Sequence, residues 1–303
     1  MKLASAVLVC SIALSGCAEQ SVGTAQVINQ SDVTSISLPQ SNQSTSLRVV
    51  ALANGAAEII SSLGYQSVLV GRDIASTESN LDDVPIVTSG HQVLPEKVIA
   101  LNPNLVFIDA STGPATALEQ IASAGIRIVK IPESWKVQDI ESKVAAIATA
   151  MNVAPQAALL INKMNNSYED SKISADKAPR VAFLYLRGTN SLYLMGGPGS
   201  GADSLLKTIG AIDVGATTLK NPFNPLTAES LATLNPDVLL VMTKGLESVG
   251  GIKGLLTLPG VAQTKAGKNS RVIAVDDSLL LSFGPRTPSL LAQLSKKFTN
   301  ETI

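Results

Sequence analysis

A pattern of thirteen residues that occurs twice constrains the fold of this chain more than any other feature of its sequence. Residues 96–108 read EKVIALNPNLVFI and residues 229–241 read ESLATLNPDVLLV, at an offset of 133 positions. In both copies an Asn-Pro pair ends an amphipathic stretch, because proline cannot continue a helix. The last four residues of each copy are apolar, which is typical of a strand covered on both faces. The sequence therefore predicts one unit of helix, stop and buried strand that is used twice.

A second, weaker correspondence relates residues 54–64 to residues 200–210, at an offset of 146 positions. Since this offset is 146 − 133 = 13 positions larger, the first half of the chain carries about thirteen additional residues between its two matching units. That longer segment, residues 65–95, contains the only histidine of the chain, His91. Function is frequently carried by loops on a rigid scaffold, so we expect this segment to contribute to a site.

Short β-branched and apolar runs alternate with amphipathic stretches from Leu47 onward, which predicts an α/β fold. A chain of 303 residues reaches the size at which one hydrophobic core stops growing, so we expect two lobes. Residues 137–151 and 154–171 have helical spacing and lie between the two copies of the pattern. The predicted organisation is an N-terminal lobe over residues 47–136, a helical crossover over residues 137–178 and a C-terminal lobe over residues 179–303.

The first residues of the chain have the pattern of an export signal. Lys2 is followed by an uncharged run over residues 3–14, which is too short to span a membrane but suits the core of a signal peptide. The run ends in Leu-Ser-Gly-Cys at residues 14–17, which resembles the bacterial lipobox, where the cysteine is diacylated and becomes the new N-terminus. We predict a signal peptide over residues 1–16 and lipidation of Cys17. The alternative is a plain signal peptide in which Cys17 is incidental.

Residues 17–46 have the composition of a flexible tether. They are rich in Ser, Gln, Asn and Thr and show no sustained hydrophobic period, so we predict a coil that packs against nothing. The expected location is outside the cytoplasm, on a bacterial membrane to which the lipid anchors the protein.

Charge and cysteine content exclude several classes of function. Lys and Arg total 23 against 24 Asp and Glu, so the chain lacks the basic field that nucleic acid or anionic lipid requires. Both cysteines, Cys10 and Cys17, precede the predicted lobes, and the chain has one histidine. A structural zinc site, an iron–sulfur cluster, a disulfide and a thiol nucleophile are therefore excluded from the lobes.

Two places carry candidate ligands for a metal-containing molecule. His91 follows an apolar run and precedes a helix expected near Pro95, which puts it on a loop at the ligand edge of an α/β sheet. On a predicted strand over residues 181–188, alternation sends Tyr185 and Arg187 to the same side. A guanidinium beside a phenol favours the phenolate, which binds ferric iron. An ordinary surface histidine and a half-buried strand tyrosine remain open as alternatives, and Tyr193 is a rival ligand without an Arg two positions on.

Two further motifs do not complete a catalytic pattern. The glycine-rich turn at residues 196–203 fits a loose dinucleotide pattern, but the acidic residue expected about twenty positions later is missing. We interpret it as a close-packed turn between strand and helix. The pair Asp276-Asp277 follows a predicted strand, where acidic residues are ordinary turn formers.

The lipoprotein signal, the two α/β lobes of similar pattern and the helical crossover together resemble the substrate-binding lipoprotein of a bacterial metal-chelate importer, a class that carries cobalamin, siderophores or heme. Over residues 47–294 the chain is most similar to the heme-binding members. The motifs that carry the resemblance are Gly90-His91, Tyr185-Leu-Arg187, GSGAD at 199–203, PLTAE at 225–229, VMTKGLESVG at 241–250 and FGPRTP at 283–288.

The resemblance implies a class III periplasmic binding protein fold, with two similar Rossmann-like lobes and the ligand in the cleft between them. It implies His91 and Tyr185 as axial ligands of the heme iron, from opposite lobes. Arg187, Arg286 and Phe223 are implied as supporting residues, and Phe223 stands where relatives often have tyrosine. Glu58 and Asp203, near the starts of corresponding helices, are implied to dock on the transporter; the alternative is that they stabilise the helix dipole.

The expected function is capture of heme and its delivery to an ABC transporter permease driven by an ATPase, with no enzymatic step. A carrier of a ferric siderophore or cobalamin is the main alternative, and would usually show a more aromatic cleft. An exported enzyme that uses the glycine-rich turn or the acidic pair, and a structural or adhesive lipoprotein, are less favoured, because every catalytic pattern is broken and adhesion does not account for the Tyr185/Arg187 pair.

Overall fold

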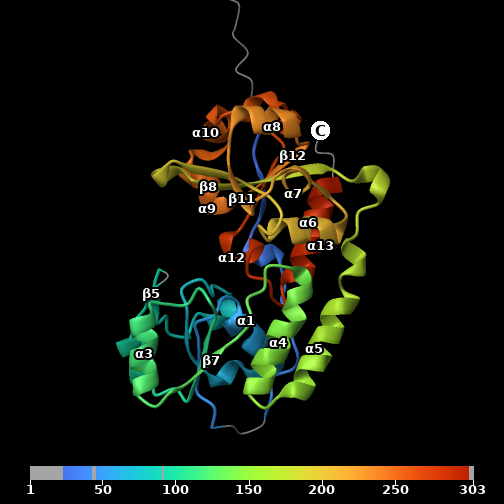
Figure 1. The fold of residues 1–303 in the computed structure, drawn as a ribbon. Helices are drawn as coiled ribbons and strands as arrows, with labels where there is room; N and C mark the ends of the chain where they lie inside the picture. Colours follow the sequence, from blue (N-terminus) through green and yellow to red (C-terminus); the bar gives the residue numbers. More distant parts are fainter. Residues whose placement is uncertain (1–22, 43–45, 91, 300–303) are drawn as a thin grey trace, which may run out of the picture.

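Two sheets organise the chain, one in each lobe, and a pair of helices runs between the lobes along one side (Figure 1). The computed structural model describes residues 23–42, 46–90 and 92–299. The predicted signal peptide, Cys17 and His91 lie outside the described residues. No helix in the described ranges is long and apolar enough to cross a membrane.

The N-terminal lobe is built on a four-stranded parallel sheet in the order β3-β2-β6-β7. The central strands are buried, as their continuous apolar runs require. The strands are β2 (Val49–Ala51), β3 (Leu69–Arg72), β6 (Leu105–Ile108) and β7 (Arg127–Lys130), and the helices are α1 (Ala56–Ile60), α2 (Pro95–Ala100) and α3 (Ala115–Ser123). The antiparallel pair β4 (Thr88–Ser89) and β5 (Gln92–Val93) projects beyond this sheet.

The C-terminal lobe holds a seven-stranded mixed sheet in the order β1-β13-β12-β8-β9-β11, with β10 also paired to β8. Its strands are β1 (Gln26–Ile28), β8 (Arg180–Arg187), β9 (Leu192–Gly196), β10 (Ile212–Asp213), β11 (Phe223–Pro225), β12 (Val238–Met242) and β13 (Val272–Val275). Its helices are α6 (Ala202–Ile209), α7 (Val214–Thr218), α8 (Ala228–Leu234), α9 (Thr243–Ser248), α10 (Gly251–Thr257), α11 (Lys265–Lys268), α12 (Asp277–Leu280) and α13 (Thr287–Thr299).

Helices α4 (Ile140–Ala150) and α5 (Ala154–Asn166) form the crossover between the lobes. They pack against each other, and one apolar cluster joins Ile147 of α4 to Phe107 of the first sheet and Phe183 of the second. The lobes therefore share buried surface. The predicted α/β fold of two lobes with a helical crossover is confirmed.

The internal repeat is visible in the backbone. Asn102 and Asn235, which are 133 positions apart, both end a helical segment with positive φ, at 46° and 38°. Gly55 and Gly201, from the second correspondence, precede α1 and α6 with φ of 71° and 89°. Asparagine and glycine tolerate this left-handed conformation better than other residues. The repeat therefore conserves the turns that set the direction of its helices and strands.

The prediction of a free coil across residues 17–46 is wrong for part of that range. β1 pairs in parallel with β13, with Gln26 opposite Ile273 and Ile28 opposite Val275, and the side chain of Ile28 is fully buried. An open sheet edge offers unpaired N–H and C=O groups to any extended segment. Three residues are enough to add a strand at this edge of the sheet. They are too few to show an alternation of apolar and polar residues in the sequence.

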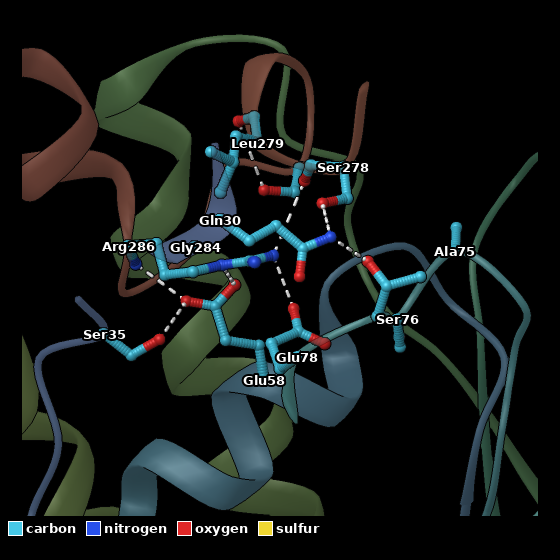
Figure 2. A network of polar contacts seen from close by, with 12 residues as sticks. Gln30, Ser35, Glu58, Ala75, Ser76, Glu78, Ser278, Leu279, Gly284 and Arg286 are labelled. Carbon is cyan, nitrogen blue, oxygen red and sulfur yellow. Dashed lines mark hydrogen bonds and ion pairs between the residues drawn. The ribbon is translucent and has the colours of Figure 1, made fainter. Parts of the chain in front are cut away.

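A buried ion-pair network, which we call the clamp, joins the lobes behind this segment (Figure 2). Arg286, in the loop that precedes α13, places its Nε 3.2 Å from Glu58 Oε2 and its Nη2 2.5 Å from Glu78 Oε1. The backbone N–H of Arg286 also donates to Glu58 Oε1 at 2.7 Å. All three side chains are at most 8% exposed. Glu58 and Glu78 belong to the N-terminal lobe, so the guanidinium holds the loop before α13 against that lobe.

Lys143 of α4 makes a second polar link, between the crossover and the loop before α13. Its Nζ donates to the carbonyl oxygens of Ser282 and Phe283 at 3.2 and 3.4 Å. Burial lowers its pKa to about 8, although Glu58 acts in the opposite direction. The loop before α13 is thus held by both the first lobe and the crossover.

We expect Arg286→Ala to lower the free energy of unfolding by about 3–5 kcal/mol, because it leaves two buried carboxylates without their cation. Urea unfolding at about pH 8 measures the loss. Lys265→Ala is the control, because it breaks an exposed ion pair with Asp237 and should cost less than about 1 kcal/mol. An Arg286→Ala protein as stable as the control would contradict the role of the clamp.

Glu78 should make stability depend on pH. Burial raises its pKa to about 7, Glu58 acts in the same direction, and Arg286 opposes both. A carboxyl whose pKa is higher in the folded chain holds its proton more tightly there, so its ionisation costs stability as the pH rises from about 4.5 to about 7. We expect Glu78→Gln to gain stability relative to the wild type over this interval, measured by urea unfolding at several pH values. A stability difference that does not change with pH would refute the assignment.

Candidate functional site

A cleft of about 250 Å³ lies between the lobes, at the carboxyl ends of the strands of the first sheet. This is the edge at which open α/β sheets bind ligands. The N-terminal lobe contributes Leu52, Asn54, Asp73, Ile74, Ala75, Thr88, Gly90, Val93, Ser111 and Thr112, and the C-terminal lobe contributes Asp277, Ser278, Leu281 and Ser282. None of these lining residues is Lys or Arg, whereas two of them are acidic.

The floor of the cleft is organised by Asp109, which follows β6. Its carboxylate accepts hydrogen bonds from the backbone N–H of Asn54 at 2.9 Å and from the hydroxyls of Ser111 and Thr112, both at 2.8 Å. Burial acts to raise the pKa of the Asp109 carboxyl. The hydrogen bonds act in the opposite direction and outweigh burial, so the pKa lies below its usual value. Asp109 was not among the predicted site residues, although its place directly after a predicted buried strand was a usable signal.

The C-terminal lobe places Tyr185, Arg187 and Phe223 together. The guanidinium carbon of Arg187 lies 4.5 Å from the centre of the Tyr185 ring, which is cation–π geometry. The Phe223 ring meets the Tyr185 ring edge to face, with centroids 5.5 Å apart. Arg187 Nη1 is 3.8 Å from Oδ1 of Asp277, which lines the cleft. Through this contact Arg187 adjoins the C-terminal wall of the cleft, whereas Tyr185, Arg187 and Phe223 are not among the residues that line it.

Tyr193 occupies the other face of the same sheet. It lies opposite Leu186 in the β8–β9 pairing, and side chains alternate along a strand, so it points away from the face of Tyr185. The packing agrees, because Tyr185 and Phe223 contact the apolar cluster shared by the lobes, whereas Tyr193 contacts a separate cluster within the C-terminal lobe. Arg187 therefore lies beside Tyr185 and not beside Tyr193, the alternative ligand.

The other proposed iron ligand, His91, lies outside the described residues. Its neighbour Gly90 lines the cleft, and β5 begins at Gln92. The role of His91 therefore stays a prediction.

Two predicted site residues belong to the clamp instead. Arg286 was expected to support the heme and Glu58 to dock on the transporter, but both are buried and paired with each other, 5% and 2% exposed. A guanidinium held between two carboxylates does not face the cleft, and a carboxylate covered by protein cannot reach a partner's surface. Both predictions are wrong for this reason.

Asp203 is half-buried in the first turn of α6. Its carboxylate accepts the backbone N–H groups of Gly199 and Gly201 at 2.8 and 3.0 Å. It therefore stabilises the glycine-rich turn, which agrees with a local structural role. Docking by Asp203 remains a prediction.

The glycine-rich turn at residues 196–203 and the pair Asp276-Asp277 have structural roles. A Cβ on Gly197 would lie 2.3 Å from the carbonyl oxygen of Asn221, so close packing requires glycine in this turn. Asp276 caps α12 by accepting the backbone N–H of Ser278. Within the described ranges no group of three or more His, Cys, Asp or Glu side chains is arranged to hold a metal ion.

Comparisons with known proteins agree with this architecture. A model of the family described as periplasmic binding protein matches residues 49–279. The apo form of the periplasmic heme-binding protein RhuT from Roseiflexus sp. RS-1 is 33% identical, with a TM-score of 0.77 over 84% of this chain and 98% of that chain. The heme-binding protein HmuT is 32% identical, with a TM-score of 0.76 over 91% and 95%. The periplasmic heme-binding protein HutB of Vibrio cholerae is 25% identical, with a TM-score of 0.74 over 83% and 98%. Comparison with curated proteins found no match.

Proposed function

The chain belongs to the periplasmic binding protein family, and we propose that it binds heme in the cleft between its lobes and delivers it to an ABC transporter permease. The observation that carries the proposal is the Arg187 guanidinium, which lies 4.5 Å from the centre of the Tyr185 ring and 3.8 Å from Asp277 of the cleft wall. The structural relatives named above are heme-binding proteins, which favours heme over a siderophore or cobalamin. The family is one of binding proteins and not enzymes.

Tyr185 is the proposed iron ligand from the C-terminal lobe. A phenolate suits ferric iron, and the guanidinium of Arg187 places a positive charge over the Tyr185 ring. Solved HmuT variants replace one tyrosine, one arginine or one histidine by alanine, and the replaced tyrosine and arginine are two positions apart. Tyr185 and Arg187 have the same spacing, which supports their pairing as a ligand and its supporting cation.

His91 is the proposed ligand from the N-terminal lobe. It is the only histidine of the chain, and it follows Gly90, which lines the cleft. A neutral imidazole is a common iron ligand in heme proteins. With Tyr185 on the other lobe, the two ligands would hold the iron from opposite sides.

The walls of the cleft suit the apolar faces of a porphyrin. Leu52, Leu281 and the 45% exposed Ile74 line it from both lobes, and Phe223 packs behind Tyr185. None of the described lining residues is Lys or Arg, so we expect the propionates of the heme to face solvent. The volume of about 250 Å³ is below the range of about 300–1,000 Å³ typical of small-molecule sites. A cleft of this volume holds only part of a heme, so we expect the heme to enter by one edge and the cleft to widen around it.

Export is the location that the family supports, and we propose anchoring through a lipid on Cys17. The transporter permease and its ATPase are the proposed partners, with Asp203 as a candidate contact on the C-terminal lobe. In this scheme the protein captures and releases its ligand and breaks no bond.

We expect Tyr185→Phe to remove the charge-transfer absorption of a tyrosinate–iron complex when the purified protein is titrated with hemin, because phenylalanine has no oxygen to bind iron. Tyr193→Phe is the matched control and should keep the wild-type spectrum. Loss of the band in Tyr193→Phe but not in Tyr185→Phe would reverse the assignment. A wild-type protein that binds no hemin would reject the proposed function itself.

We expect His91→Ala to fold normally and to bind hemin at least tenfold more weakly, with an altered Soret band, because one axial bond is lost. Spectroscopic titration measures the affinity, and thermal unfolding without ligand checks the fold. Gln92→Ala, at the next position, is the control. Wild-type affinity and spectrum in His91→Ala would show that the histidine does not ligate the iron.

A further inference from the structure

The segment over residues 26–41 is fixed to both lobes. At its start, β1 pairs with β13, and Ile28 accepts a hydrogen bond from the backbone N–H of Asp276, in the C-terminal lobe. At its end, the backbone N–H groups of Leu38 and Ser41 donate to the carbonyl oxygens of Ser62 and Gly64, in the N-terminal lobe. The segment, blue in Figure 1, therefore crosses from one lobe to the other as a connection separate from α4 and α5.

Gln30 makes the crossing beside the cleft. Its side-chain Nε2 lies 2.6 Å from Thr77 Oγ1 in the N-terminal lobe and 3.1 Å from Ser278 Oγ in the C-terminal lobe, with Asp276 Oδ1 at 3.4 Å. In Figure 2 the amide of Gln30 lies beside Ser278. Because Ser278 lines the cleft, one carboxamide joins the two lobes at the border of the candidate heme site.

The middle of the segment rests on polar groups. Ser35 Oγ donates to Glu58 Oε1 at 3.1 Å, and a cavity of about 400 Å³ separates residues 30–37 from the clamp. Serine side chains, among them Ser61, Ser62 and Ser79, line much of this cavity. The other side of the segment is held firmly, because Val33 is buried in the apolar cluster that the lobes share, Ile36 and Leu38 pack against that cluster, and the backbone N–H of Ile36 donates to the carbonyl oxygen of Pro285 at 3.1 Å. The contacts of the Gln30 side chain can therefore break while the rest of the segment stays in place.

We propose that residues 29–38 are a strap across the joint between the lobes, and that Gln30 is the latch that keeps the ligand-free cleft narrow. The proposal rests on the proposed heme function. Widening the cleft moves Ser278 away from Thr77, and one amide cannot stay bonded to both. The latch therefore opens when heme enters, and the strap keeps its attachment to the sheet edge through β1.

The test compares Gln30→Ala with Gln40→Ala, which makes the same change at an exposed position of the same segment. Stopped-flow mixing with hemin should show association at least threefold faster for Gln30→Ala than for the control and the wild type. Hydrogen exchange of the ligand-free chain should be faster in Gln30→Ala over residues 72–80 and 276–283, which are the segments that the amide joins.

Equal association rates, or equal exchange in both segments, would overturn the latch. Hydrogen exchange needs no ligand, so it tests the link between the lobes even in a protein that binds no hemin. A wild-type protein without hemin binding would reject the heme function and the access role of Gln30 together, whereas binding with unchanged rates would reject the latch alone.

Discussion

One buried guanidinium fixes the relation between the lobes on which the cleft depends. Charges removed from water are tolerated only when partners surround them, and Arg286 meets this condition through carboxylates that come from the opposite lobe. The loop that carries Arg286 also carries Ser282, which lines the cleft and whose carbonyl accepts from Lys143. Arg286 and Lys143 therefore position this wall of the cleft, although neither side chain lines it.

The cleft itself follows from the parallel strands of the N-terminal lobe. Their carboxyl ends meet at one edge, and the polar residues that follow them fold back onto Asp109. The C-terminal lobe supplies a different chemistry, a phenol covered by a cation and backed by an aromatic ring. A ligand held between the lobes meets hydroxyl and apolar groups on the N-terminal side, where the proposed ligand His91 would join them, and the proposed ligand Tyr185 on the C-terminal side.

Much of this architecture could be predicted from local pattern, because a helix, an Asn-Pro stop and a buried strand are each encoded within a few residues. The pairing of Tyr185 with Arg187 was equally local, since strand alternation alone places them on one side. The clamp was not predictable, because Glu58 and Arg286 are 228 positions apart and each matches a motif with another expected role. The position of β1 was hidden for a related reason, since its partner strand begins with a residue far along the chain, Val272.

If Cys17 carries the proposed lipid, the attachment of β1 to the second sheet shortens the distance that the protein can reach above the membrane. With a lipid on Cys17, the predicted tether ends at Gln26, nine residues later, instead of extending through residue 46. At about 3.3–3.6 Å per residue, nine residues span at most about 30 Å. The body would then stand within about this distance of the bilayer, with the edge of the C-terminal sheet nearest the anchor. A carrier held this way would search a thin layer for its transporter and would present a restricted set of orientations to it.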